Sequence, residues 1–254
     1  MNLFKQWYKS LYSPKDIVKL RFQSIGKTIL YVFFLSLLSI VPSAIYGSKE
    51  ITEVVGSINE IALSTLPDFT IDQGKLTSSI TVPEKYEYGD TIILFDSTGK
   101  LSADDLEDYD KSYGFFLDEF AYYSNGYVQS IPYDLLSDLT ITKENLLDFL
   151  NSVEDVLPII IILFIITTFL LAASIKFVEI SLFALFGLSI CRLISKHLPY
   201  RRLWVISAYS ITLSLTFLTM MTLLKINVIS SYFVYWFVSL TILYLALREI
   251  PGKK

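Results

Sequence analysis

Residues 156–194 read VLPIIIILFIITTFLLAASIKFVEISLFALFGLSICRLI, and this run decides the fold class. Only Lys176, Glu179 and Arg192 interrupt it with a charge. A helix on the surface of a soluble domain keeps one polar face, whereas a membrane helix needs about 20 consecutive, mostly apolar residues. The run therefore predicts lipid, not water, as the solvent around this part of the chain.

Three more apolar stretches accompany this run, at residues 28–46, 203–224 and 226–247. The chain as a whole is 53% hydrophobic, with a mean hydropathy of +0.51. We divide the long run into helices 156–175 and 177–194, because each part is long enough to cross a bilayer. The sequence thus predicts a polytopic α-helical membrane protein with about five membrane helices and a membrane domain over 156–254.

The division at Lys176 leaves two topologies open. Lys176 and Glu179 stand three residues apart on one helix face, and we expect them to mark a turn at the membrane surface. If 177–194 instead lies along the inner face, there are four crossings, and every basic cluster stays on one side. Charge favours four crossings and apolar length favours five; we expect five.

Charge separates the segment between the first two apolar stretches from the rest. Residues 48–155 hold 22 of the 25 acidic residues but only 6 of the 21 basic ones. Loops rich in Lys and Arg tend to remain cytoplasmic. We therefore expect a multi-pass protein of the plasma membrane, with the N-terminus cytoplasmic, 28–46 as the first membrane helix, and 47–155 as an extracytoplasmic domain.

Residues 1–27 are basic and amphipathic, with Phe4, Trp7 and Tyr8 at helical spacing. Ser13 followed by Pro14 is a typical start for a second helix. Such a stretch suits the cytoplasmic surface of a membrane. An ordinary charged flank that fixes orientation explains the same residues equally well.

The domain at 47–155 is expected to be a small α+β module. The only cysteine, Cys191, lies in an apolar stretch, so the domain folds without a disulfide. Residues 51–63 have helical spacing and are expected to continue the first membrane helix, and residues 140–157 are expected to close the domain as a helix. Between them, FTIDQGKLTSSITV and DTIILFDSTGKL resemble strands, each with a Gly-Lys turn, at Gly74-Lys75 and Gly99-Lys100. Asn125-Gly126 predicts a hairpin turn.

Sequence motifs for catalysis, cofactors or metal binding are absent, and we expect no enzyme, cofactor or metal site. The single histidine, His197, lies in a basic loop. Residues 108–119 place Asp108, Asp110, Ser112 and Glu119 at ligand positions of a calcium loop, but Tyr113 occupies the position that needs glycine. We interpret this segment as a solvated acidic face.

An aromatic cluster in the outer domain has two interpretations. Rings at this density usually form the core of a small sheet, which we favour. Aromatic rings beside carboxylates also bind sugars. The cluster comprises Phe115, Phe116, Phe120, Tyr122, Tyr123 and Tyr127. The last two apolar stretches carry mainly Ser, Thr and Tyr as polar groups, which pack membrane helices together or line a polar route.

Four stretches together resemble an uncharacterised family of bacterial membrane proteins. They are residues 4–43, PDFTIDQGKL (67–76), ILFDSTGKL (93–101) and YRRLWVISAYSITLSL (200–215). Some members carry the label maltodextrin-utilisation protein MalA. The C-terminal half is also faintly similar to the five-span Yip family. The resemblance implies a Gram-positive plasma membrane, with the outer domain facing the cell wall.

Two functions follow as hypotheses. The first is a non-enzymatic membrane protein with an outer sensing, binding or scaffolding domain. The second is an accessory or permease-like component of maltodextrin or oligosaccharide uptake, which the family label implies. The expected partners are the lipid bilayer and, in addition, another membrane protein or an oligosaccharide transporter; no nucleic acid is expected.

Overall fold

The computed structural model describes residues 2–64, 66–124 and 126–251. It divides into a helical unit, Met1–Lys49 with Ile160–Lys254, and an α+β unit, Glu50–Ile159. Helices α3 (Ile25–Ser64) and α4 (Lys143–Leu193) each contribute to both units. Within the described residues, four helical stretches are long and apolar enough to cross a membrane: α3, α4, Tyr200–Leu223 and Ser231–Arg248. The chain is therefore a multi-pass membrane protein with a small α+β domain between its first two long helices.

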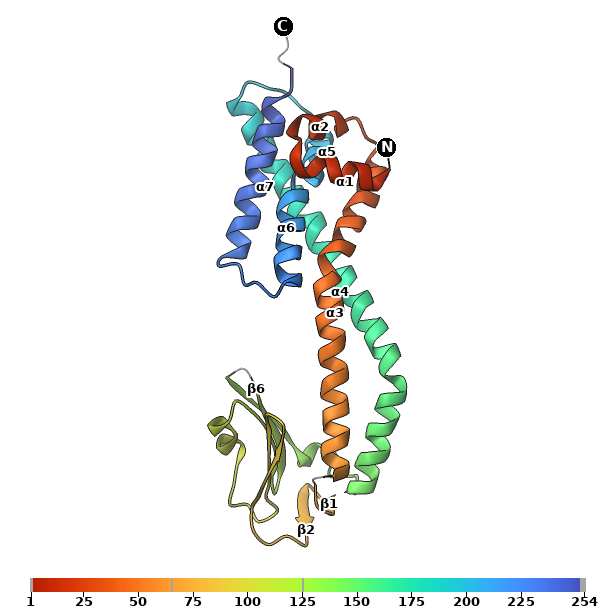
Figure 1. The fold of residues 1–254 in the computed structure, drawn as a ribbon, viewed down its shortest axis with the longest axis vertical. Coiled ribbons are helices and arrows are strands. Elements are labelled where there is room, and N and C mark those ends of the chain that lie inside the picture. The colour runs from red at the N-terminus through yellow and green to blue at the C-terminus, as the bar shows by residue number, and fades with distance from the viewer. Residues whose placement is uncertain (1, 65, 125, 252–254) are drawn as a thin grey trace. The chain divides into compact units, whose positions relative to one another are not determined.

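The helical unit contains two short N-terminal helices packed on longer ones (Figure 1). The short ones are α1 (Leu3–Tyr12) and α2 (Pro14–Leu20). The others are the first part of α3, the second part of α4, α5 (Tyr200–Ser210), α6 (Thr212–Leu223) and α7 (Ser231–Arg248). Its core buries Ile17, Tyr31, Ile180, Leu203 and Leu247, among others.

The N-terminal segment packs on the membrane helices. As predicted, Ser13 caps α2, accepting a hydrogen bond from the Asp16 backbone N–H at 3.2 Å, with Pro14 in the first turn. In α1 the buried side chains are the polar Gln6 and Ser10, and the Tyr209 hydroxyl donates to Gln6 Oε1 at 2.7 Å. This segment is therefore a docked part of the helical unit.

Three basic stretches that are far apart in the sequence meet at one end of the helical unit. Lys15 Nζ lies 4.0 Å from Glu249 Oε2. Lys196 Nζ donates to the Ile250 carbonyl at 2.6 Å. The Arg202 guanidinium lies 5.3 Å from the centroid of the Phe22 ring. Helix α1 and the end of α7 lie at this same end of the unit (Figure 1).

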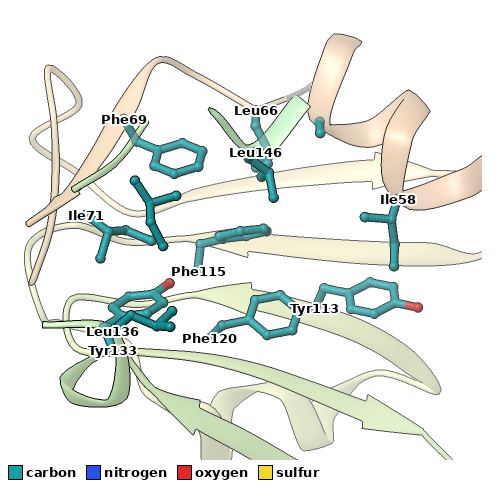
Figure 2. Close-up of a pocket in the computed structure, with 12 residues that line it drawn as sticks. Ile58, Leu66, Phe69, Ile71, Tyr113, Phe115, Phe120, Tyr133, Leu136 and Leu146 are labelled. Carbon is teal, nitrogen blue, oxygen red and sulfur yellow. The ribbon is translucent and has the colours of Figure 1, made fainter. Parts of the chain in front are cut away.

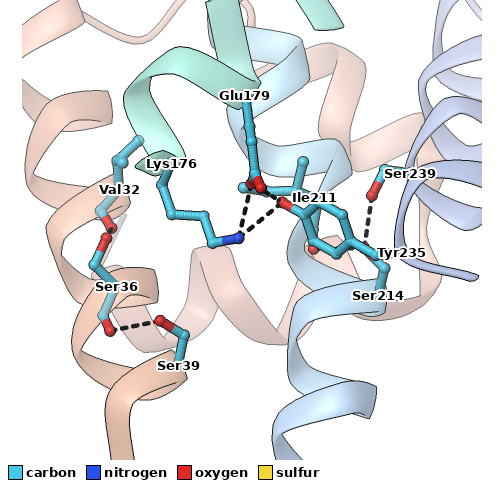
Figure 3. Close-up of polar contacts among 9 residues, drawn as sticks. All are labelled: Val32, Ser36, Ser39, Lys176, Glu179, Ile211, Ser214, Tyr235 and Ser239. Carbon is cyan, nitrogen blue, oxygen red and sulfur yellow. Dashed lines mark hydrogen bonds and ion pairs between the residues drawn. The ribbon is translucent and has the colours of Figure 1, made fainter. Parts of the chain in front are cut away.

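Helix α4 continues through Lys176 without a turn, so the predicted division into 156–175 and 177–194 is corrected. Four long apolar helices replace the five we expected. The charges are neutralised inside the unit: Lys176 Nζ lies 2.7 Å from Glu179 Oε2, and the Tyr235 hydroxyl donates to the same oxygen at 2.7 Å (Figure 3). Because each charge has a close partner, the helix can remain regular here.

The third apolar stretch, predicted as a helix over 203–224, forms one candidate span over Tyr200–Leu223, with a local irregularity at Ile211 that separates α5 from α6. Hydroxyl groups around the irregularity bond to backbone carbonyls, from Ser210 to Ile206 and from Thr212 to Tyr209. Such bonds compete with the helical ladder and often bend helices. The fourth stretch forms α7, which begins at Ser231, later than the predicted residue 226.

The α+β unit contains two sheets. The first has the order β2-β1-β8 and is antiparallel. The second has the order β3-β4-β5-β6-β7 and is antiparallel except for the parallel pair β4–β5, whose connection includes the 3₁₀ helix η1 (Ala103–Asp108). The strands are β1 (Phe69–Asp72), β2 (Lys75–Ser78), β3 (Glu84–Tyr88), β4 (Thr91–Phe95), β5 (Lys111–Phe115), β6 (Glu119–Ser124), β7 (Tyr127–Pro132) and β8 (Ile141–Thr142).

The hairpin predicted at Asn125-Gly126 is present, and the turn predicted at Gly74-Lys75 is present one residue earlier. Strands β1 and β2 are joined by Gln73 and Gly74, both with positive φ, as a two-residue hairpin turn requires. Strands β6 and β7 also pair, and Gly126 has φ +85°; Asn125 lies outside the described residues.

The helix expected to close the domain does not end there. Thr142 and Asn145 cap its start reciprocally, since the Asn145 backbone N–H donates to Thr142 Oγ1 at 3.2 Å and the Thr142 backbone N–H donates to Asn145 Oδ1 at 3.1 Å. The helix that starts here is α4 itself, and it runs on into the helical unit. On the other side, residues 51–63 continue the first membrane helix as predicted.

Asp96 organises the loop after β4, where the sequence reads FDSTGKL. Its side chain is fully buried and accepts four hydrogen bonds, from the backbone N–H groups of Thr98, Lys100 and Leu101 and from the Thr98 hydroxyl, at 2.6–2.8 Å. Burial alone raises the pKa of this carboxyl, but the hydrogen bonds outweigh burial and hold the pKa below its usual value. The ionised carboxylate is thus the form that the loop stabilises.

We predict that Asp96→Asn destabilises the α+β unit by about 2 kcal/mol at pH 7, since hydrogen bonds to a charged acceptor are worth roughly that much. The pKa of Asp96 is lower in the folded state than its unfolded value of 3.8, so the carboxylate stabilises the folded unit fully above pH 3.8. This stabilisation disappears as the pH falls through the folded pKa. Hydrogen exchange of β4 and β5 peptides under urea, at pH 7 and at a pH below the lowered folded pKa of Asp96, measures it. Asp108→Asn, at an exposed position, is the control; equal effects of the two variants would contradict the prediction.

We predict that Lys176→Met and Glu179→Gln each destabilise the helical unit by about 1–3 kcal/mol, because each removes the opposite charge from a partly buried ion pair. The double variant is expected to recover most of this loss, since the amide introduced by Glu179→Gln could still accept from Tyr235. All three tryptophans, Trp7, Trp204 and Trp236, belong to the helical unit, so their fluorescence during thermal unfolding reports on it selectively. If the double variant lost as much stability as the two single variants together, the pairing of Lys176 with Glu179 would be contradicted.

Candidate functional site: an apolar cavity in the α+β unit

The α+β unit contains a cavity of about 280 Å³ (Figure 2). Its walls come from α3, from strands β1, β5, β6 and β8, from the 3₁₀ helix η2 (Tyr133–Leu136) and from the start of α4. The twelve lining residues are Ile58, Ala62, Leu66, Phe69, Ile71, Tyr113, Phe115, Phe120, Tyr133, Leu136, Ile141 and Leu146. The volume is nearly twice that of the roughly 150 Å³ apolar cavity known to admit benzene.

Strand periodicity places these side chains on one face of the five-stranded sheet. Successive strand residues point to opposite faces, so Tyr113 and Phe115 of β5 share one face with Phe120 of β6. The other face buries Phe116 and Ala121 against Leu106 of η1. The sheet therefore has two apolar faces, one closed by η1 and the other turned toward the cavity.

Two tyrosines, Tyr113 and Tyr133, line the cavity, but its accessible surface is entirely apolar, so the Tyr133 hydroxyl is enclosed beside the cavity and is not exposed in it. The Tyr133 side chain is 3% exposed, and among the described residues its hydroxyl has no hydrogen-bond partner. Figure 2 shows this hydroxyl pointing in among the apolar side chains, with Phe115 and Ile71 nearby. A buried unpaired hydroxyl costs about 1–3 kcal/mol, so its place in a folded domain requires an explanation.

Electrostatics fix the state of that hydroxyl. Burial, and then the nearby carboxylates of Glu119 and Asp118, raise the pKa of Tyr133 far above its usual value. The group therefore remains a neutral donor and acceptor at every physiological pH. A lone water would gain little here, because an ordered water needs two to four polar partners and the lining offers few.

A wider groove of about 570 Å³ shares Ile58, Tyr113 and Phe120 with the cavity lining. Unlike the cavity, the groove is amphipathic: Glu50 and Glu53 of α3 contribute carboxylates, and the strands contribute Lys111, Tyr122 and Tyr123. Rings beside carboxylates are the pattern that the sequence suggested for sugar binding.

The residues that the sequence singled out fall mainly outside the cavity. Cys191 is buried in the core of the helical unit, in keeping with a packing role. His197 lines a small surface hollow with Arg192 and Lys196.

The acidic segment 108–119 does not form a calcium loop, because residues 111–115 are strand β5 and Glu119 begins β6. Among the described residues, no three His, Cys, Asp or Glu side chains are grouped to hold a metal ion.

The aromatic cluster divides by location. Phe116 is buried, Phe115 and Phe120 line the cavity, Tyr122 and Tyr123 line the groove, and Tyr127 is exposed. Sequence reasoning did not identify Tyr133. A single tyrosine after a strand carries no motif, and its unpaired hydroxyl depends on contacts that only the fold creates.

The comparisons with known proteins identify a family but no activity. A family model described as a protein of unknown function, DUF1189, matches residues 4–247. No curated protein and no solved structure matches the chain. Neither the maltodextrin label nor the likeness to Yip proteins receives support from these comparisons. Because the match covers nearly the whole chain, the protein belongs to the DUF1189 family, whose function is unknown.

Proposed function

We propose that this protein is a multi-pass membrane protein whose outer α+β domain binds a small, largely apolar molecule that carries one neutral hydrogen-bonding group. The observation that supports the proposal is the apolar cavity together with the Tyr133 hydroxyl, which is buried beside it without a partner among the described residues. Binding pockets typically combine apolar walls with a few placed polar groups. An alkyl chain of roughly nine carbon atoms would fill the volume if each carbon takes about the 30 Å³ of one water molecule.

The charge of the domain narrows the ligand class. Residues 48–155 carry an excess of acidic side chains, and Asp118 and Glu119 lie close enough to Tyr133 to raise its pKa. An anionic head group such as a carboxylate would be repelled, so a neutral alcohol, amide or ester suits the site. The lining offers no nucleophile-and-base pair among its described residues, which favours a binding role over an enzymatic one.

We also propose the topology that the charges support. Four crossings return the chain to its starting side, and the three basic stretches meet at one end of the helical unit. The positive-inside rule would make that end cytoplasmic and the acidic domain extracytoplasmic. A sensor or scaffold in the plasma membrane would have this arrangement.

The second candidate is oligosaccharide binding in the groove, as a component of an uptake system. It rests on the carboxylates of Glu50 and Glu53, which line the groove together with Tyr122 and Tyr123. Aromatic faces and carboxylates together match the apolar and hydroxyl surfaces of a sugar. This function would be favoured over the first if a maltodextrin slowed hydrogen exchange in these groove segments while an alcohol did not slow exchange in the segments that line the cavity.

We predict that 1-octanol slows hydrogen exchange in β1, β5, β6 and η2 of the full-length protein in lipid nanodiscs by several-fold. Ligand binding stabilises the native state by mass action. Ala62→Phe is expected to abolish the effect, because Ala62 is buried and lines the cavity. Leu63→Phe adds a ring at the next, exposed position of α3 and is the matched control. Equal responses of the two variants would contradict the proposal.

We predict that Tyr133→Phe acts in opposite directions on the empty and the occupied site. Without ligand it stabilises the α+β unit by about 1 kcal/mol, since it removes an unpaired buried hydroxyl. With ligand it removes the preference for octanol over octane, since only the alcohol can pair with that hydroxyl. Exchange of η2 peptides, with both ligands, measures each effect; a destabilised empty variant would show that the hydroxyl already has a partner.

A further inference from the structure

A second candidate site lies in the helical unit, at the end where the three basic stretches meet. The guanidinium carbon of Arg21 lies 4.4 Å, and that of Arg202 5.3 Å, from the centroid of the same Phe22 ring. Arg21 follows the end of α2, Phe22 is the next residue, and Arg202 lies in the first turn of α5. Helices α2 and α5 pack together, so this convergence is part of the fold of the unit.

The two guanidinium groups have no counter-charge of their own. Over residues 2–64, 66–124 and 126–251, no carboxylate lies within 4.0 Å of either group. The Arg21 side chain instead donates a 3.2 Å hydrogen bond to the Val18 carbonyl. Burial and the positive charge of Arg202 lower the pKa of Arg21. The ring attracts each guanidinium, but the two like charges repel each other, and a bound anion would relieve that repulsion.

More positive charge lies near the ring, in a hollow that Phe22 also lines. This hollow of about 260 Å³ is lined by Phe22, Gln23, Lys9, Lys19 and Asp16, among others. Asp16 Oδ1 lies 3.6 Å from Lys9 Nζ and 2.9 Å from Lys19 Nζ, so one carboxylate serves two ammonium groups. Around Phe22, four basic side chains therefore accompany a single acidic one from the part of the chain that the structure describes.

We propose that Arg21 and Arg202 bind the phosphate of an anionic phospholipid at this end of the helical unit, with Phe22 in contact with the apolar part of the same lipid. Guanidinium groups bind phosphate oxygens through paired, charge-assisted hydrogen bonds. Phe22 is 66% exposed beside them, and an exposed ring within a membrane protein suits the region where head groups meet acyl chains. A free phosphate would gain nothing from that ring, so a lipid is the better fit. The proposal does not depend on the ligand of the outer domain.

The test compares lipids bound to the full-length protein in nanodiscs that contain equal amounts of phosphatidylglycerol and phosphatidylcholine. Native mass spectrometry after release counts the lipids that stay bound. The wild type is expected to retain phosphatidylglycerol in preference to phosphatidylcholine. In the double variant, Arg21→Gln with Arg202→Gln, the ratio of the two bound lipids is expected to fall about tenfold. Arg201→Gln, at the exposed neighbouring position, is the control and should keep the wild-type ratio.

Three results would overturn the proposal. One is an unchanged lipid preference in the double variant, and another is an equal loss in Arg201→Gln. In the third, the protein in detergent binds inorganic phosphate only when both arginines are present, but shows no preference for phosphatidylglycerol in nanodiscs. This result would identify a site for a free anion. If the Gln variant does not fold, as judged by tryptophan fluorescence, Arg21→Lys with Arg202→Lys replaces it. This variant keeps the charge but loses the paired geometry, and is expected to lose several-fold of the preference.

Discussion

A backbone inside a bilayer must satisfy its own hydrogen bonds, and this constraint governs the structure around residues 156–194. A turn at Lys176 would leave backbone groups unpaired wherever lipid excludes water. The helix avoids that cost by neutralising Lys176 and Glu179 against each other and against the Tyr235 hydroxyl of α7. One helix then replaces the two we expected, and four candidate crossings replace five. The number of crossings determines which side of the membrane the C-terminus would occupy.

Polar contacts also connect the rest of the helical unit. Helix α1 attaches to α5 and α6 through Gln6 with Tyr209 and Trp7 with Thr216, while the Ser214 and Ser239 hydroxyls join α6 to α7 at 2.6 Å (Figure 3). Hydrophobic burial cannot drive helices together in lipid, so hydrogen bonds and close packing do so. The Ser, Thr and Tyr residues that could have lined a transport route are thus largely engaged in helix packing.

The sequence predicted features that depend on neighbouring residues. The Ser13–Pro14 helix start, the β1–β2 and β6–β7 hairpins, and the continuation of the first membrane helix through residues 51–63 are all present. Features set by distant contacts were missed. The neutralisation of Lys176 and Glu179 inside a continuous helix involves the Tyr235 hydroxyl, which is far away in the chain. The irregularity at Ile211 was not predicted either, and similar hydroxyl-to-carbonyl bonds leave α3 and α4 regular. Tyr133 became a candidate only when the fold enclosed its hydroxyl.

The proposed arrangement of four crossings, with both ends on one side of the membrane, is tested most directly by cysteine labelling in intact cells. Cys191 would first be replaced, and single cysteines placed at exposed positions: Lys5, Asp90, Lys225 and Glu249. A membrane-impermeant maleimide should then label the Asp90→Cys and Lys225→Cys proteins from outside. The Lys5→Cys and Glu249→Cys proteins should react only after the cells are permeabilised. Labelling of Glu249→Cys from outside, with Lys225→Cys protected, would contradict the account and restore five crossings.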